Sequence, residues 1–257
     1  MNRITPIEVK SVLTKQAGKQ RIPYDFTINP YRGCLFGCSY CYASKFVHDD
    51  DDKKAEWGHW VEYKKNAVDA LQRESHKLTG STIFFSSATD PYQPVERRLE
   101  LTRALLEVLL FSFPSHLHIQ TRSPMVIRDI DLFLRFGRTL AVGISIPTDS
   151  EVVRKAFEPR APSIPRRLDA ARRLKEAGIR ATASIAPLLP CTPVRLARLL
   201  KPCVHRAWVG EINFYEKEGR LREIYRQHGW ERYLEPSHGR NVQEALESLG
   251  LRQAHPP

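Results

Sequence analysis

Three cysteines in a short loop have the residue type and the spacing to hold a metal centre. Cys34, Cys38 and Cys41 form the pattern C-x3-C-x2-C, and thiolates at this spacing can converge on one centre. Gly33 and Gly37 allow the backbone to fold around that centre, because glycine adopts conformations that other residues avoid. This cysteine loop is therefore the first candidate for chemistry in the chain.

Three explanations compete for the cysteine loop. A structural zinc ion needs four protein ligands, so His48, Cys191 or Cys203 would have to supply the fourth. A [4Fe–4S] cluster is held by cysteine thiolates, and three cysteines leave one of its irons open to an outside ligand. Three small buried thiols with no ligand are the plain alternative. Because a centre that lacks one protein ligand is suited to a reaction, the pattern favours the cluster.

The alternation of apolar and amphipathic segments predicts the fold that positions this loop. The predicted strands cover residues 25–29, 82–88, 117–121, 140–146, 179–187 and 206–214, and the predicted helices cover 63–78, 99–111, 126–136, 164–177 and 193–201. Six strands that alternate with helices predict a parallel sheet of βαβ units in one α/β domain. Residues 45–58, which include an acidic run, are predicted to form a solvated loop.

Polar clusters follow several of the predicted strands, where α/β barrels carry their functional groups. They are the cysteine loop, Thr89 with Asp90, Thr121 with Arg122, Ser145, and the region around Cys191. Around this core we expect three parts: an N-terminal arm at 1–24, a barrel at 25–215, and a basic helical extension at 216–257.

Charge and composition narrow the classes of protein further. The 257 residues include 40 Lys and Arg against 29 Asp and Glu, and residues 151–257 alone carry 20 bases against 12 acids. Such an excess indicates a nucleic acid or another polyanion as partner, or simply a basic protein. No apolar run is long enough to span a membrane, and the N-terminus lacks the apolar core of a signal peptide. An odd number of cysteines argues against a disulfide framework. These features predict a cytoplasmic protein.

A wider set of motifs resembles the radical S-adenosylmethionine (SAM) superfamily and, within it, the spore photoproduct lyase-like family. The motifs are NPYRGCLFGCSYCYA, TDPYQPVE, TRSP, SIPT, FEPRAPS and APLLP, in that order along the chain. The resemblance runs from about Asn29 to Pro190, with a weaker tail to about Tyr233. It implies a partial (βα)6 barrel, which agrees with the six strands predicted independently.

The resemblance also implies cofactors and a reaction. The cofactors would be a [4Fe–4S] cluster and SAM, and an electron from a reductant such as flavodoxin or ferredoxin would cleave SAM to a 5′-deoxyadenosyl radical. That radical would abstract hydrogen from a substrate, while the protein positions the cofactors and excludes competing reactions. DNA repair of the lyase type, or the modification of a base, is the activity that the family suggests.

Individual residues match positions of the family to different extents. The three cysteines match the cluster ligands, Tyr40 matches an aromatic whose neighbourhood packs on adenine, and Thr89 with Asp90 matches the motif for the amino group of SAM. The resemblance further assigns Arg122 to the SAM carboxylate, Ser145 to a SAM contact, and Tyr42 to a radical relay. Each of these also has an ordinary explanation, such as a turn, a surface cation or a packed ring.

One position departs from the family. Spore photoproduct lyase carries a cysteine near the end of the second strand as a hydrogen donor, and this chain has Ser87 there. The O–H bond of serine is too strong for serine to replace the cysteine thiol as a hydrogen donor. We hypothesise that Cys191 faces the barrel mouth and acts as a substitute donor or substrate contact, although a small buried thiol is its ordinary explanation. In the basic C-terminal segment, Arg232 is a candidate for substrate binding.

Three hypotheses of function follow. The first is a radical SAM enzyme that acts on a nucleic acid base or a nucleotide. The second retains the radical chemistry but directs it at a protein, a peptide or a small metabolite. The third is a non-catalytic iron–sulfur or zinc protein that binds nucleic acid.

Overall fold

The computed structural model describes residues 2–16, 23–47, 51–212 and 219–254. His48 and residues 213–218, which span the expected boundary of the extension, lie outside the described residues, as do positions 49 and 50 of the acidic run. Two sheets form the described fold. One has eight strands in the order β11-β10-β9-β8-β7-β6-β3-β2, and the other has three in the order β1-β5-β4.

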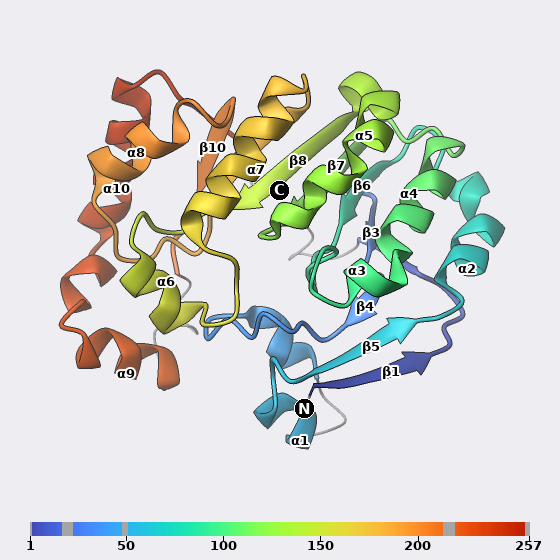
Figure 1. Ribbon diagram of the computed structural model, residues 1–257, viewed down its shortest axis with the longest axis horizontal. Coiled ribbons are helices and arrows are strands. Elements are labelled where there is room, and N and C mark those ends of the chain that lie inside the picture. The colour runs from blue at the N-terminus through green and yellow to red at the C-terminus, as the bar shows by residue number, and fades with distance from the viewer. Residues whose placement is uncertain (1, 17–22, 48–50, 213–218, 255–257) are drawn as a thin grey trace.

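The large sheet contains the six predicted strands. They are β3 (Phe26–Ile28), β6 (Thr82–Phe85), β7 (His116–Thr121), β8 (Leu140–Ser145), β9 (Arg180–Ile185) and β10 (Arg206–Val209). Each is parallel to its neighbour. The two outer strands, β2 (Leu13–Lys15) and β11 (Arg252–Gln253), do not pair with each other. The described sheet is therefore an open, partial barrel, and the α/β fold predicted from the sequence is confirmed (Figure 1).

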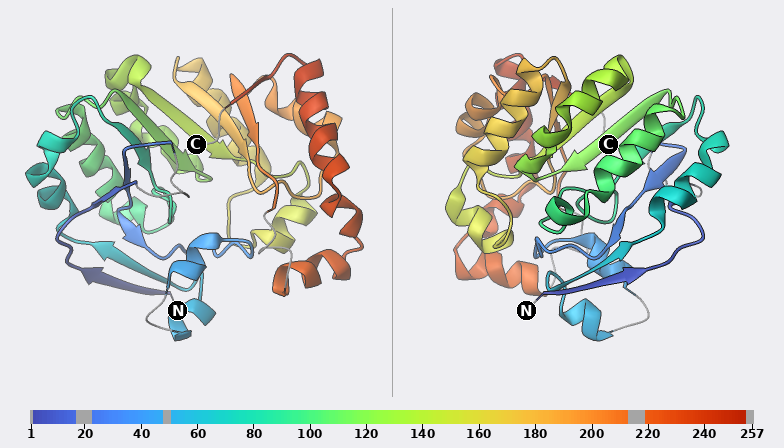
Figure 2. Two further views of the ribbon diagram at one scale, coloured as in Figure 1. Left: turned by 180° about the vertical axis from the view of Figure 1, so that it is seen from behind. Right: turned by 45° about the vertical axis from the view of Figure 1, so that its right-hand side comes forward.

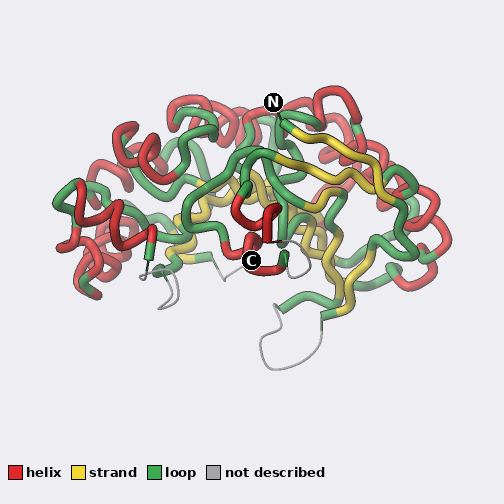
Figure 3. The backbone as a smooth tube through the Cα atoms, turned by 90° about the horizontal axis from the view of Figure 1, so that it is seen from below, coloured by secondary structure: helices red, strands yellow, loops and turns green. Residues whose placement is uncertain are grey.

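Helices cover the outer side of this curved sheet, and the strands line its inner side (Figures 2 and 3). The α-helices are α1 (Asp51–Ala55), α2 (Ala67–Arg73), α3 (Glu96–Leu99), α4 (Leu101–Leu110), α5 (Ile130–Phe136), α6 (Glu151–Phe157), α7 (Ile164–Glu176), α8 (Pro193–Leu200), α9 (Arg220–Gln227) and α10 (Pro236–Ser248). The 3-10 helices are η1 (Tyr42–Phe46), η2 (Ser75–Lys77), η3 (Pro124–Asp129), η4 (Gly137–Thr139) and η6 (Glu231–Leu234). None of the helices among the described residues has the length and apolarity to cross a membrane.

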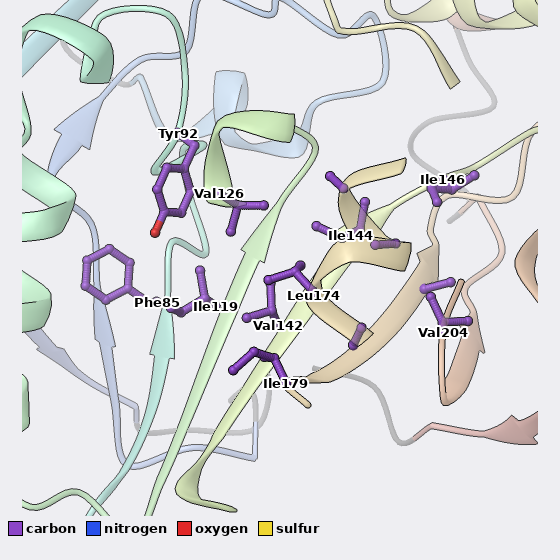
Figure 4. Packing of buried hydrophobic residues seen from close by; sticks show 14 of the residues in the cluster. Phe85, Tyr92, Ile119, Val126, Val142, Ile144, Ile146, Leu174, Ile179 and Val204 are labelled. Atoms are coloured by element: carbon purple, nitrogen blue, oxygen red, sulfur yellow. The ribbon is translucent and has the colours of Figure 1, made fainter. Parts of the chain in front are cut away.

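The side chains of each strand alternate between two environments, as the pleat of a strand requires. One face packs under the helices and forms the core, in which Val142 and Ile144 of β8 meet Leu174 of α7 (Figure 4). The other face turns to the inside of the barrel and carries polar side chains such as His118, Gln120 and Ser184. The hydrophobic helix faces thus fix the curvature of a sheet whose inner surface is available for ligands.

The N-terminal region differs from its prediction. The expected arm supplies β1 (Arg3–Ile7) and β2, and β1 pairs with β5 (Trp60–Lys64), which the sequence analysis did not predict. The expected helix at 63–78 covers only Ala67–Arg73, because the residues up to Lys64 belong to β5. The Asn66 side chain bonds both the backbone N–H and the C=O of Val9. The expected loop at 45–58 contains the short helix α1. The antiparallel β4 (Tyr31–Arg32) completes this small sheet beside the cysteine loop.

Candidate active site

The cysteine loop, residues 33–41, connects β4 to η1 and folds tightly against the segment before β5. Gly33 has a φ of +81°, and a Cβ atom there would lie 2.7 Å from the Trp60 ring and from its carbonyl oxygen. Gly37 has a φ of +57°, and its Cβ would lie 3.0 Å from the Cα of Gly58. Both positions require glycine, because a side chain would be strained by the backbone and would also collide with a neighbour.

All three cysteines of the loop line one cavity of about 550 Å³, a volume typical of small-molecule sites. Cys34 and Cys38 are buried, and burial raises the pKa of the Cys34 thiol to about 12 and that of Cys38 well above its ordinary value. Buried thiols of this kind ionise readily only beside positive charge, which the irons of a cluster supply.

The residues present fit a cluster in number and in chemistry. No three His, Cys, Asp or Glu side chains among the described residues gather closely enough to hold a single metal ion. A [4Fe–4S] cluster does not require that convergence, because each cysteine thiolate binds a different iron. The cavity beside the cysteines leaves space for a ligand on the iron that has no cysteine.

Much of the remaining cavity wall comes from the C-terminal ends of the strands, and Tyr42 of η1 also lines it. Four residues that the sequence analysis singled out, Thr89, Asp90, Arg122 and Ser145, follow or end three different strands. The parallel sheet brings these four together, as expected for the carboxyl ends of adjacent strands. Ser87, which stands where the lyase has its cysteine, also lines this cavity.

Thr89 and Asp90 hold the segments around the cavity in place. The buried Asp90 carboxylate accepts hydrogen bonds from the Thr121 hydroxyl at 2.6 Å and from the backbone N–H of Arg122 and Tyr92, both at 2.9 Å. The Thr89 hydroxyl donates to the Gly33 carbonyl oxygen at 2.7 Å. Asp90 thereby fixes the end of β7, and Thr89 fixes the start of the cysteine loop.

Arg122 is at the centre of a buried charge network. Its Nη1 lies 2.6 Å from the Cys38 Sγ, 2.7 Å from Glu158 Oε1 and 3.0 Å from the Tyr40 hydroxyl. The other Glu158 oxygen accepts a hydrogen bond of 2.5 Å from Arg167 Nη2, and the side chains of Glu158 and Arg167 are both 0% exposed. Burial opposes the ionisation of Glu158, but the two guanidinium groups outweigh it and hold the pKa of this carboxyl below its ordinary value. The network places a cation against a cluster ligand.

The sequence analysis missed Glu158 and Arg167. Glu158 belongs to the string FEPRAPS, which carried part of the resemblance but received no role, and Arg167 falls in the predicted helix 164–177. Arg167 also donates to the Ser145 backbone carbonyl at 3.1 Å. The sequence feature that could have identified Arg167 is its position on the apolar side of the predicted helix. A buried charge must be paired, so an arginine there implies a buried carboxylate partner.

Tyr40, Tyr42 and Ser145 occupy three different environments. Tyr40 is buried outside the cavity wall, and its hydroxyl donates to Glu158. Tyr42 is 46% exposed at the cavity, and its hydroxyl donates to the backbone carbonyl of Ser87. The Ser145 hydroxyl accepts from Gln120 Nε2 at 2.9 Å inside the barrel.

Cys191 and Arg232 are not brought to the cavity. Cys191 is 5% exposed, belongs to the main hydrophobic core, and has its Sγ 3.6 Å from His238 Nε2 of α10. The expectation that it faces the barrel mouth is therefore not met, because α10 packs over it. Arg232 is exposed on η6, where its guanidinium stacks 4.9 Å from the centre of the Tyr233 ring.

A second cavity of about 430 Å³ continues along the inside of the barrel and shares Gln120, Ser184 and Trp208 with the first. Its wall includes the guanidinium-bearing residues Arg180 and Arg206. None of the described residues on this wall has a carboxylate side chain. We call it the inner cavity.

The open barrel and the three-cysteine cavity define the class of a radical SAM enzyme. A model of the Radical SAM superfamily matches residues 28–201, and the chain belongs to that superfamily. It is 35% identical over 190 residues to an uncharacterised protein of Methanocaldococcus jannaschii, covering 74% of this chain and 70% of that one. It is also 30% identical over 199 residues to a protein of the Acidianus two-tailed virus, covering 75% of this chain and 65% of that one.

Solved structures share the fold. A spore photoproduct lyase variant with a dinucleoside spore photoproduct matches with a TM-score of 0.63 at 17% identity, over 96% of this chain and 77% of that one. A second variant of that lyase, with bound AdoMet and the same dinucleoside, matches with a TM-score of 0.62 at 17% identity and the same coverage. As a radical SAM enzyme, the chain has a [4Fe–4S] cluster and SAM as its cofactors and needs a reductant.

Proposed function

We propose that this enzyme abstracts hydrogen from a nucleic acid base or a nucleotide, as in base modification or DNA repair. When bound, the cluster and SAM supply a 5′-deoxyadenosyl radical after one-electron reduction. Cys34, Cys38 and Cys41 hold the cluster, and Thr89, Asp90, Arg122 and Ser145 form the wall on which SAM is oriented. Tyr40 acts from behind this wall through Glu158. Residues 25–215 form the catalytic unit in this proposal.

The inner cavity is the observation that carries the substrate class. Arg180 and Arg206 face the same space with no carboxylate on its described wall, and burial together with the charge of Arg206 lowers the pKa of Arg180. An anion between the two guanidinium groups relieves their repulsion, and phosphate matches their planar donors. The Trp208 ring at the junction with the first cavity offers a surface on which a base can stack.

Two residues are candidates for a part in the return of hydrogen, Tyr42 as a radical relay and Cys191 as a hydrogen donor. Tyr42 lines the cavity beside the three cysteines, which we call the reaction cavity, whereas Cys191 is covered by α10. We therefore propose Tyr42 as the relay residue. The Tyr42→Phe variant should lose product turnover while it still cleaves SAM, and Cys191→Ala should retain turnover. The reverse result would return the role to Cys191.

Anaerobic reconstitution tests the chemistry. The wild-type protein should bind four irons and release 5′-deoxyadenosine from SAM when dithionite is added. Cys38→Ala should lose both properties, and Cys203→Ala is the matched control because Cys203 is similarly buried but lies in the main hydrophobic core, where its Sγ donates to the Leu199 carbonyl oxygen of α8. A colourless protein that binds zinc would support the non-catalytic alternative.

The substrate class is tested by isotope transfer. Deuterated oligonucleotides and deuterated peptides are offered separately, and label is followed into 5′-deoxyadenosine. Transfer from the oligonucleotide supports the proposal, and the Arg180→Gln/Arg206→Gln variant should reduce it while leaving uncoupled SAM cleavage intact. Transfer from the peptide alone would favour modification of a protein.

A further inference from the structure

A large basic groove is lined by residues of the segment around α3 and of the start of α7. Both elements lie on the outer, helical side of the large sheet (Figure 1). The groove encloses about 1220 Å³ and is lined by five arginines, Arg97, Arg128, Arg160, Arg166 and Arg173, and by two carboxylates, Glu100 and Asp169. We call it the arginine groove. The reaction at the strand ends uses none of these side chains.

Three of these arginines present their charge to solvent. Arg128 is paired with the buried carboxylates of Glu96 and Asp129. In contrast, Arg97, Arg166 and Arg173 are exposed, and no ion pair or side-chain hydrogen bond among the described residues involves their guanidinium groups. Charges that are not paired within the protein produce a field that attracts an oppositely charged surface.

The arginine groove and the reaction cavity lie on two sides of the same two loops. Phe36 of the cysteine loop lines the groove, while its neighbour Gly37 lines the cavity. Likewise Ser123 lines the groove and Arg122 lines the cavity. A partner seated in the groove is therefore separated from the cluster site by the cysteine loop and by the segment that follows β7.

Arg160 links the groove to the segment on which the cysteine loop packs. Its guanidinium donates to the Gly58 carbonyl oxygen, and a Cβ atom on Gly37 would lie 3.8 Å from its Nη1. At this point the wall of the groove therefore lies next to the cysteine loop.

We propose that the arginine groove is the docking surface for a small acidic protein that carries one low-potential electron. In the transfer the carrier is oxidised by one electron and the cluster is reduced by one, and no bond forms or breaks. Opposite charges accelerate encounter and set orientation more than they add affinity, which suits a carrier that must bind, deliver and leave. This inference rests on the radical SAM chemistry proposed above.

A bound nucleic acid explains the groove less well. A strand lying there would have the cysteine loop between its bases and the reaction cavity, so it could not present a base to SAM. The substrate must enter from the inner side of the barrel, where the inner cavity joins the reaction cavity. The two basic regions thus serve different partners.

The test uses a variant in which three arginines of the groove are replaced by glutamine. Its control variant has the same net charge because it loses three arginines elsewhere on the surface. The groove variant is Arg97→Gln/Arg166→Gln/Arg173→Gln. The control variant carries Arg→Gln at three exposed positions that do not line the groove, Arg135, Arg198 and Arg240. Circular dichroism establishes that both variants are folded.

The first measurement is the binding of an acidic flavodoxin by calorimetry, with the reconstituted enzyme at two salt concentrations. We expect the groove variant to bind at least about tenfold more weakly than the wild type at low salt, and the difference to shrink at high salt. The control variant should bind like the wild type. Equal binding by all three proteins would overturn the proposal.

The second measurement compares two reductants in SAM cleavage. The groove variant should lose rate with reduced flavodoxin and keep the wild-type rate with dithionite, which needs no docking surface. An equal loss with both reductants would show that the arginines act on the site itself, and a loss of oligonucleotide binding in place of flavodoxin binding would assign the groove to nucleic acid. If the wild type fails to cleave SAM even with dithionite, the proposed function fails instead.

Discussion

Replacement of Glu158 by glutamine should destabilise this protein more than any surface substitution. Glu158 and Arg167 are both 0% exposed and are joined by a 2.5 Å hydrogen bond. The glutamine amide keeps the shape of the side chain but leaves the buried Arg167 guanidinium without a negative charge to balance it. Removing one member of a buried ion pair costs about 3–5 kcal/mol, so we expect the free energy of unfolding to fall by that amount.

Urea unfolding of the apoprotein, followed by circular dichroism, measures this loss. Glu176→Gln is the matched control, because Glu176 pairs with Arg172 on the exposed face of α7, the helix that also carries Arg167. Exposed pairs of this kind contribute at most about 0.5 kcal/mol. In the double variant Glu158→Gln/Arg167→Met the buried Arg167 charge is gone and only Arg122 still lacks the Glu158 carboxylate, so the losses of the two single variants should exceed that of the double variant by about 2 kcal/mol. A loss below about 1 kcal/mol in Glu158→Gln, or strict additivity, would refute the idea that Glu158 and Arg167 form a strongly coupled buried ion pair.

Three further predictions concern acid, the cysteine loop and the core. The pKa of Glu158 is held below its ordinary value of 4.5, so the stability that it adds over glutamine is complete above that pH; unfolding at several pH values should show it disappearing as the pH falls through the lowered pKa. Gly33→Ala should reduce the iron bound on reconstitution, whereas Gly80→Ala, also at positive φ but with nothing within 4 Å of its Cβ, should not. Leu105→Ala, at 0% exposure, should cost about 2–5 kcal/mol in urea unfolding, against at most about 0.5 kcal/mol for the exposed Leu134→Ala.

The sequence predicted those elements whose hydrophobic pattern is strong and local. The six central strands and the helices from α4 to α8 follow from such patterns, except α6, which was not predicted. Of the strands that were missed, β4 and β11 have only two residues each, and β1 and β5 are distant partners of one another. Thus β1 contains Pro6, which is tolerated at an edge, and pairs with β5 more than fifty residues later. No local pattern encodes such a pairing.

The site shows the same division between local and distant information. The spacing of the three cysteines is local and placed them in one loop, and the strand-end rule placed Thr89, Asp90, Arg122 and Ser145 on one cavity. In contrast, the partners of Arg122 come from other elements of the fold, so the sequence assigned it to SAM alone and did not foresee its contact with Cys38. Cys191 was misplaced for a similar reason, since the helix that covers it is 47 positions away.

The excess of positive charge is explained by the three-dimensional arrangement better than by the linear count. Counted along the chain, the basic excess after residue 150 indicated a nucleic acid or another polyanion as partner. In the fold, Arg166 and Arg173 of α7 join Arg97 from the first half on the outer face, beside the cysteine loop. Arg180 and Arg206 instead line the inner cavity. A protein that must accept an electron from one side of its cluster and a substrate from the other needs two separate attractive surfaces, and neutralising one should leave the other intact.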